Sequence, residues 1–308
     1  MTTANNIQSP KVRKHYDVVF PIVNAILLII LMFVTLYPVI NTVAYSFNDG
    51  TDALKAGIGL WPRVFSTQSY QSILSDPAVY QAAWISASKT VIITILNLFW
   101  TSMLAYTLTR REYVLRKIIT TMMVLTMYVN AGLIPNYLLI TKTLHLQKSY
   151  WVYIIPTMFS CFNMVVLRTY IAGLPEALVE SARIDGAGDI RIFWQIIFPL
   201  CKPVLATVAL FVAVGSWNSW FDTHLYNASK VNLHSLQYLL KMKLATTQAS
   251  SNAAQSSAEA LASSASAKTT PVTIRCAITV ISTVPILVVY PFLQKYFVTG
   301  MVLGSVKG

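Results

Sequence analysis

The stretch that decides the fold is ESARIDGAGDIRIFWQIIFPL, Glu180–Leu200, which lies between two long apolar segments. The first residues can form a short helix, which Gly186 and Gly188 end. Asp189 can then cap the helix that enters the next apolar segment. The residues alone therefore predict a short helix on a membrane surface, closed by a tight turn. A plain connector at the membrane interface remains an open alternative.

The composition indicates a protein that is solvated mostly by lipid. Of its 308 residues, 55% are hydrophobic and only 11% are charged, and the mean hydropathy is +0.58. Soluble chains usually carry about 25% charged residues. The net charge of +12 could suggest a nucleic-acid partner. However, the basic residues form short clusters between apolar runs, which membrane topology explains better than nucleic-acid binding.

Six apolar stretches are long enough to cross a bilayer, which takes about 20 residues. Basic residues precede the first stretch and crowd the second loop, whereas the third loop has only two of them. The positive-inside rule therefore places both termini and the second and fourth loops in the cytoplasm. We expect an all-α integral membrane protein with spans at about 18–45, 85–108, 118–140, 150–170, 192–217 and 272–297.

The polar residues disfavour several classes of function. All eleven acidic residues lie in loops or at span ends, so no carboxylate is available at the middle of the membrane to carry a coupling proton. A stand-alone secondary transporter or channel is therefore the alternative rather than the first choice, although carbonyls and hydroxyls could still hold sodium. A membrane-embedded enzyme is disfavoured because HExxH, GxSxG and metal-ligand spacings are absent. The GxxxxGK[ST] nucleotide loop is absent too, so energy must come from a partner.

The spacing in the fourth loop resembles the EAA loop of permease subunits in binding-protein-dependent ABC importers. In that family Glu-Ala-Ala is followed after three residues by Gly and after nine more by Ile-x-Leu-Pro. Glu180-Ser181-Ala182, Gly186 and Ile196-Ile197-Phe198-Pro199 keep every interval. SWNSW (216–220) and the C-terminal YPFLQKYFVTGMVLGSVKG (290–308) resemble the carbohydrate branch, in the style of the second permease of maltose-type importers, and its oligosaccharide subgroup.

The resemblance implies a type I ABC importer permease fold with six transmembrane helices. Residues 1–17 would be a cytoplasmic N-terminus, 18–297 the six-span domain, 222–271 an extracellular Ser/Ala-rich loop and 298–308 a cytoplasmic tail. The short helix at about 174–188 would be the coupling helix, seated in a groove of a cytoplasmic ATPase. A frayed terminus remains the alternative for the tail. The residues implied in ATPase coupling are Glu180, Ser181, Ala182, Asp185, Gly186, Pro199, Lys307 and Gly308.

The resemblance also implies the rest of the assembly. The chain would be a permease subunit of an ATP-driven importer of oligosaccharides or glycans, located in a bacterial cell membrane as a multi-pass protein with both termini in the cytoplasm. Its partners would be a second homologous permease, two ATPase subunits, an extracellular solute-binding lipoprotein, an oligosaccharide and membrane lipid, with no nucleic acid. The chain itself would have no catalytic residue, metal or cofactor, because ATP and Mg²⁺ bind to the partner ATPase.

Sugars are typically held by aromatic faces and by amide or hydroxyl hydrogen bonds. Polar groups at membrane depth must face protein or a water-filled cavity, so they are candidates for the substrate path. Each could equally make a helix–helix hydrogen bond, and each tryptophan could anchor at the interface. The Ser/Ala-rich segment 246–268 is read as a linker, with a polar surface helix as the alternative. The path candidates are Tyr128, Asn130 and Asn136 near the Gly132/Pro135 break, Asn163, Trp217, Asn218 and Trp220.

Overall fold

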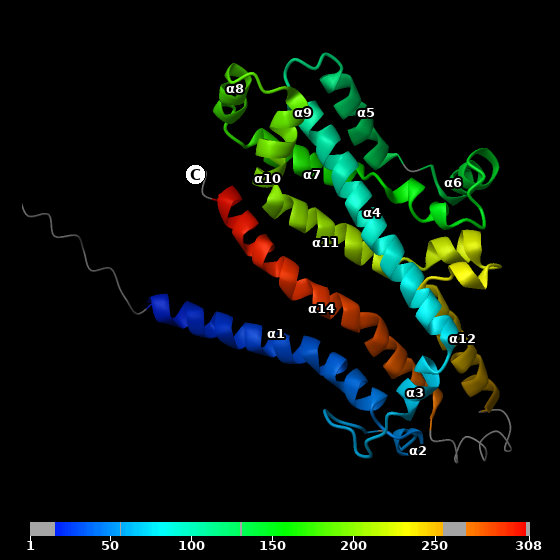
Figure 1. Cartoon of the computed structure of the whole chain (residues 1–308). Coiled ribbons are helices and arrows are strands. Elements are labelled where there is room, and N and C mark those ends of the chain that lie inside the picture. The colour runs from blue at the N-terminus through cyan, green and yellow to red at the C-terminus, as the bar shows by residue number, and fades with distance from the viewer. Residues whose placement is uncertain (1–15, 56, 130, 255–268, 306–308) are drawn as a thin grey trace, which may run out of the picture. The chain divides into compact units, whose positions relative to one another are not determined.

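The structure, a computed structural model, describes residues 16–55, 57–129, 131–254 and 269–305 (Figure 1). These residues are helical, with one antiparallel bridge between Asn48 and Phe65 and no strand among them. The chain divides into two compact units, residues 1–70 with 258–280, and residues 71–257 with 281–308. The boundary passes through two helices, α3 (Gln68–Leu74) and α14 (Pro271–Ser305).

The first unit contains α1 (Tyr16–Ser46), the short α2 (Gly50–Ala53) and the beginning of α14. The stretch Val19–Ser46 has a mean hydropathy of 2.7 and is long enough to cross a bilayer. The loop after α2 is tied to the end of α1, because the Asn41 amide donates to the carbonyls of Ile58 and Gly59, at 2.8 and 2.9 Å.

The second unit is built around α4 (Pro77–Thr109), the long cyan helix of Figure 1. Asp76 caps its first turn by accepting from the backbone N–H of Ala78 at 2.9 Å, and Pro77 occupies the first position. α4 packs against α7 (Cys161–Ala172) and α11 (Lys202–Asn218). The core of this unit therefore lies between these three helices, and it includes the fully buried Leu108, Leu167 and Val208.

Three of the expected spans are broken rather than straight. α5 (Arg116–Tyr128) bends by 115° into α6 and the turn that follows it, Leu133–Thr143, and Gly132 lies at the break with a φ of 86°. The second bend, of 42°, joins the two 3-10 turns within Tyr150–Thr157 to α7. The third, of 79°, joins Asp189–Leu200 to α11. The individual bounds are α6 Leu133–Leu138, π-turn Leu139–Thr143, 3-10 turns Tyr150–Val152 and Ile155–Thr157, α9 Asp189–Ile192, π-turn Phe193–Ile197 and α10 Phe198–Leu200.

Six spans result when each bent pair counts as one span beside α1, α4 and α14. This agrees with the six-span, all-α architecture that the sequence predicts. The break in the third span also falls at the predicted Gly132/Pro135 position. α4 begins at Pro77, well before the predicted residue 85, because the segment in front, PAVYQAAW (77–84), contains three alanines and no glycine. These residues are compatible with a helix although they add little hydrophobicity.

The region 222–271, predicted as an extracellular loop, contains helical turns and a helix. A π-turn at Thr223–Asn227 and a 3-10 turn at Val231–Leu233 lead into α12, Leu236–Ala254. The linker interpretation of segment 246–268 is therefore wrong as far as Ala254, because the alanines of this stretch favour a helix. Residues 255–268 lie outside the described part of the chain. Lys243 of α12 pairs with Asp76 at 2.7 Å, which fixes α12 to the beginning of α4.

Candidate functional site

The predicted short helix is present as α8, Ala177–Ile184, within the expected region 174–188. It lies at the end of the second unit where α4 ends and α5 begins (Figure 1). One face packs inward, because Val179 and Ala182 are 4% and 7% exposed and belong to the core cluster of this unit. Glu180 and Ser181 are exposed on the other face. α8 is therefore an amphipathic helix that is anchored on one side and open to a partner on the other.

The glycine of the motif ends α8 for a specific geometric reason. Gly186 has a φ of 79°, a left-handed conformation that costs a residue with a Cβ about 1–2 kcal/mol. The backbone N–H of Ala187 donates to the carbonyl of Ala182 at 2.9 Å, and that of Gly186 donates to Arg183 at 3.0 Å. This pair of bonds is the Schellman arrangement, which satisfies carbonyls at a helix end. Asp185 lies just before the turn and is exposed.

An ion-pair network ties α8 to the loop after α4. Both terminal nitrogens of Arg183 donate to the carboxylate of Glu112, and one of them also donates to Asp189 at 3.1 Å. These hydrogen bonds lower the pKa of Glu112 and raise that of Arg183. Asp189 does not cap α9 as predicted: Gly188 is the cap residue, without a side-chain bond, and Asp189 is the first helical residue. The carboxylate of Asp189 instead accepts a hydrogen bond from Arg183, and this charge-assisted bond takes the place of the predicted cap.

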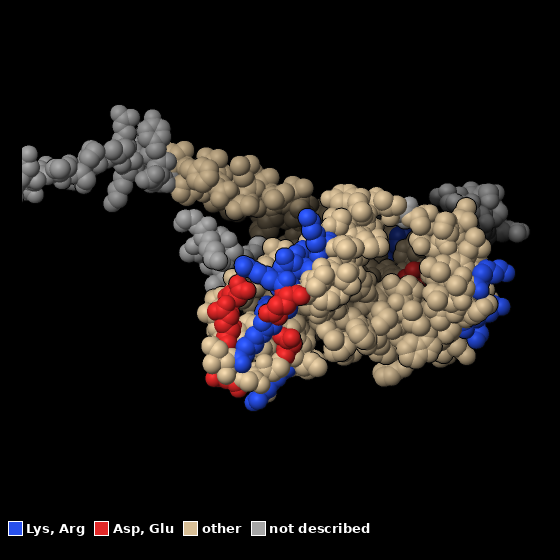
Figure 2. Space-filling model, turned by 90° about the horizontal axis from the view of Figure 1, so that it is seen from above, with Lys and Arg blue, Asp and Glu red and all other residues tan. Residues whose placement is uncertain are grey.

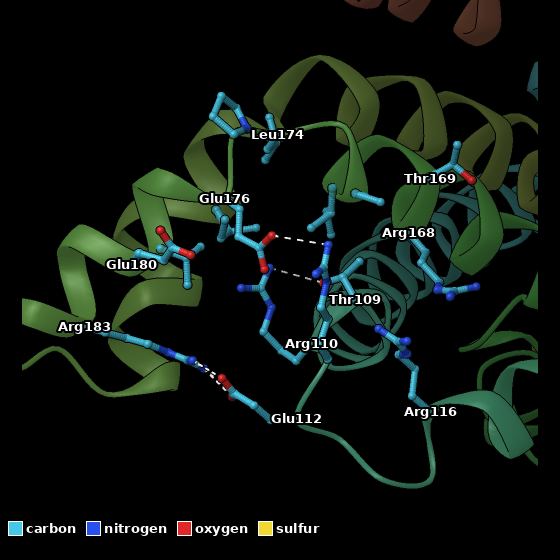
Figure 3. Close-up of a pocket in the computed structure, with 16 residues that line it drawn as sticks. Thr109, Arg110, Glu112, Arg116, Arg168, Thr169, Leu174, Glu176, Glu180 and Arg183 are labelled. Carbon is cyan, nitrogen blue, oxygen red and sulfur yellow. Dashed lines mark hydrogen bonds and ion pairs between the residues drawn. The ribbon is translucent and has the colours of Figure 1, made fainter.

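A cavity of about 530 Å³ lies beside α8 and is lined by residues of α4, α7, α8 and the α4–α5 loop (Figure 3). Figure 3 shows Arg183 and Glu112 directed toward each other across one edge. A weaker ion pair, Arg111 to Glu176 at 3.6 Å, joins the same loop to the residue before α8. Seen from above, charges of both signs gather in one region of the surface, basic residues form a smaller group at the opposite edge, and most of the surface between them is uncharged (Figure 2).

Comparisons with known proteins identify the family. The model for binding-protein-dependent transport system inner membrane components matches residues 97–221. LplC of Bacillus subtilis is 35% identical over 275 residues, which are 89% of this chain and 90% of that protein. The polygalacturonan/rhamnogalacturonan transport system permease protein YtcP of Bacillus subtilis is 36% identical over 281 residues, 91% of this chain and 96% of that protein. This chain belongs to that permease family.

A solved structure extends the agreement to the fold. One chain of a bacterial ABC transporter involved in the import of the acidic polysaccharide alginate matches the permease with a TM-score of 0.81. The two are 28% identical, and the match covers 94% of the permease and all of the other chain. The permease is therefore a multi-pass membrane protein with the type I importer fold, and its family transports rather than catalyses.

The remaining motif residues have defined positions in the permease, except at the C-terminus. Pro199 is exposed in α10 (Phe198–Leu200), directly before the 79° bend into α11. A proline there is compatible with the break, because it has no backbone N–H to continue the hydrogen-bond ladder. Lys307 and Gly308 lie outside the described residues. Among the residues that are described, no three potential metal ligands come together.

A second cavity, of about 350 Å³, lies within the helix bundle between α4, α7 and α11. Asn163 and Asn97 line it and bond to each other, with the amide of Asn163 donating to Asn97 at 3.2 Å. The amide of Asn97 donates in turn to the carbonyl of Thr157 at 3.1 Å. Lys89 of α4 lines the same cavity and is only 1% exposed. The cavity therefore combines apolar walls with amide groups and one ammonium group.

Of the other predicted path residues, those that the structure describes do not line this cavity. Trp217 donates from its indole N–H to the carbonyl of Ser282 at 3.1 Å, so it makes a contact between α11 and α14. The amide oxygen of Asn218 accepts from Gln237, and the ammonium of Lys241 lies over the ring of Trp220. The roles of all of these in transport stay predictions. Two more candidates, Tyr128 and Asn136, are exposed near the break in the third span, and Asn130 lies outside the described residues.

Sequence reasoning missed Lys89 although a signal was present. The search for ionisable groups inside the spans considered carboxylates only, because these carry coupling ions. Lys89 is a lone lysine inside the second predicted span, in the run ISASKTVIITILN, 85–97. An intramembrane ionisable residue of either sign is a reason to suspect a functional site. The same criterion applied to basic residues would have found it.

Proposed function

We propose that this permease is one half of the translocation path of an ATP-driven importer of oligosaccharides. Support comes from the family match and from the names of similar proteins. YtcP is named for polygalacturonan and rhamnogalacturonan transport, and AraQ of Bacillus subtilis, 27% identical over 296 residues, is named for arabinooligosaccharide transport. The partners we propose are a second homologous permease, two ATPase subunits that bind ATP and Mg²⁺, and an extracellular solute-binding lipoprotein.

We propose further that α8 is the surface through which the ATPase drives the permease. The observation that carries this proposal is the exposure of two large apolar side chains, one at the end of α8 and one in α9: Ile184 is 87% exposed and Ile190 is 76% exposed. Both flank the turn at Gly186, close in sequence to the ion pairs that Arg183 and Glu176 make with the α4–α5 loop. Apolar side chains that remain exposed among charged ones are typical of protein interaction surfaces.

This assignment also sets the orientation. With α8 and the basic α4–α5 loop at the same end, positive-inside reasoning puts that end in the cytoplasm of a bacterial cell and α12 outside. Six spans then place both termini in the cytoplasm. Glu180, Ser181 and Asp185 are exposed around Ile184 and are the polar groups that would contact the ATPase, whereas Ala182 packs inward and permits a close approach of α8 to the core.

The test is coupled activity of the complex reconstituted in vesicles. Ile184→Glu and Glu180→Lys should abolish ATP-driven uptake and the stimulation of ATP hydrolysis by the loaded binding protein, because each change opposes docking of α8. Val114→Glu is the matched control: Val114 is 90% exposed on the α4–α5 loop, at the same end of the unit. Full uptake in both α8 variants would refute the coupling role, and uptake by the permease pair without any ATPase would favour a secondary transporter.

A further inference from the structure

The ammonium group of Lys89 is buried in the bundle without a carboxylate in contact. It donates to the carbonyl of Ser219 at 3.0 Å and lies 5.0 Å from the centre of the Tyr153 ring. Among the described residues, no carboxylate approaches it within 4.0 Å. A buried charge is costly unless it is paired. A lysine has three N–H donors, so the cavity side of this group retains capacity for an anion.

Asp222 lines the same cavity but is held by another group. Its carboxylate accepts a hydrogen bond from the hydroxyl of Ser219, and the carbonyl of the same residue accepts the bond from Lys89. Ser219 therefore links the two groups, and Asp222 is close enough to interact electrostatically with Lys89 without forming an ion pair within 4.0 Å. Both residues line the cavity, and the ammonium keeps N–H donors beyond its bond to Ser219.

The remaining lining fits a sugar ring. Aromatic side chains, Tyr153, Phe159 and Phe211, lie in the same lining as the amides of Asn97 and Asn163. Aromatic faces pack against the C–H surfaces of a pyranose, and amides bond to its hydroxyls. A volume of about 350 Å³ is within the usual range for small-molecule sites, roughly 300–1,000 Å³. The second permease subunit would contribute the rest of the path.

We infer that Lys89 is the binding group for a carboxylate of the transported glycan, so that the substrate class of this permease is uronic-acid-bearing oligosaccharides. This inference rests on the proposed function, since it assigns a substrate to the proposed path. A neutral sugar requires no buried cation, because the amides of Asn97 and Asn163 can form hydrogen bonds with its hydroxyls. The competing explanation is structural: Ser219 follows the last residue of α11, and a cation at a helix C-terminus is favourable there.

The experiment measures binding of two ligands to the full complex in detergent, without the binding protein, by equilibrium dialysis. One ligand is trigalacturonate and the other is its carboxyl-reduced trisaccharide, which has the same size and no charge. We expect at least tenfold tighter binding of the acid by the wild type, as loss of a charge-assisted hydrogen bond implies. Lys89→Met should reduce this preference to within about twofold, and Lys89→Arg should keep most of it.

Two further variants sharpen the test. Asp222→Asn removes the negative charge from the same lining, so it should tighten binding of the acid and leave the reduced trisaccharide unchanged. Lys230→Met removes an exposed lysine that does not line the cavity, and it should change neither affinity. If Lys89 acted only through the net charge of the protein, Lys89→Met and Lys230→Met would lower the affinity for trigalacturonate equally.

Each remaining outcome overturns one specific statement. Equal binding of the two ligands by the wild type, or an equal loss for both in Lys89→Met, would show that Lys89 only supports α11. Uptake of oligosaccharides by the vesicle-reconstituted complex without measurable binding of trigalacturonate would overturn the inference and leave the proposed function intact. A complex that takes up no oligosaccharide, although ATP and the binding protein are supplied, would overturn the proposed function itself.

Discussion

The docking of α8 can be tested through Val179, which holds the helix against the core. The side chain is 4% exposed, and Val179→Ala removes two methyl groups from the core cluster. At about 0.8 kcal/mol for each buried carbon the docked state loses ~1.6 kcal/mol. Alanine has the higher helix propensity and returns up to about 0.6 kcal/mol. The net loss is about 1 kcal/mol, which raises the undocked population roughly fivefold.

Hydrogen exchange of the α8 amides, followed by mass spectrometry, measures this population directly. Leu178→Ala is the control, because Leu178 is the neighbouring residue of α8 and is already 39% exposed. Its truncation should change exchange less than twofold. In the assembled complex, Val179→Ala should also raise the number of ATP molecules hydrolysed per glycan imported, since a loosely held α8 transmits less of the movement of the ATPase.

Two results would refute this reasoning. If Val179→Ala left exchange in α8 within twofold of the wild type, the buried face would not be what holds the helix. If Leu178→Ala accelerated exchange as much as Val179→Ala, burial in the structure would not predict the energetic contribution of either residue. In the first case the Arg183–Glu112 ion pair would become the principal attachment of α8.

Three further predictions follow from the geometry and charges. Gly186→Ala should speed hydrogen exchange in α8 about fivefold or more, because Gly186 has a φ of 79° and a Cβ there adds strain of about 1–2 kcal/mol. Gly188→Ala is the control and should change exchange little, because Gly188 has a φ of −73° and open space where the Cβ would lie. Gly50→Ala places a Cβ 2.8 Å from backbone atoms of Thr269, so the melting temperature should fall, while Gly59→Ala, with nothing within 4 Å, should leave it unchanged. The hydrogen bond from Lys243 lowers the pKa of Asp76, so this contact stabilises the folded state above the unfolded pKa of 3.8, and the stabilisation is lost as pH falls through the lower folded pKa. Hydrogen exchange in α12, corrected for intrinsic rates, should therefore be constant from pH 8 to 5 and rise below pH 4. The variant Asp76→Asn should remove that rise.

The positions of the spans could be predicted because each span is a continuous run of about 20 apolar residues, which is visible in the sequence itself. The break at Gly132 and Pro135 was predictable too, since both residue types interrupt helices locally. The π-turn at Phe193–Ile197 was not, because nothing in its sequence differs from an ordinary apolar helix. The π-turn lies between α9 and α10, and its residues Phe193 and Ile197 are buried in the core. Packing against distant residues leaves no pattern in the local sequence from which a π-turn could be predicted.

In the fourth loop, sequence spacing located the helix α8 and the glycine that ends it, but not the contacts that attach α8 to the rest of the unit. Arg183 and Glu112 are 71 residues apart, and only the fold brings them together. The same contact explains why Asp189 does not cap α9: an arginine competes successfully for its carboxylate. In the bundle, Asn163 was found as a polar residue in an apolar span, whereas its partner Asn97 has the same signal and was passed over.

The uninterrupted course of α4 has a mechanical consequence. Its 33 residues make one helix about 50 Å long, without an internal proline, whereas the third, fourth and fifth spans are all broken. The helix carries the capping Asp76 before one end, Lys89 in the cavity and Glu112 just beyond the other end. A stiff rod turns as a whole, so a rotation imposed at Glu112 must reappear at Lys89 with the same angle. Spin labels at the two ends should therefore move in step, and the bent spans must absorb whatever deformation accompanies that rotation.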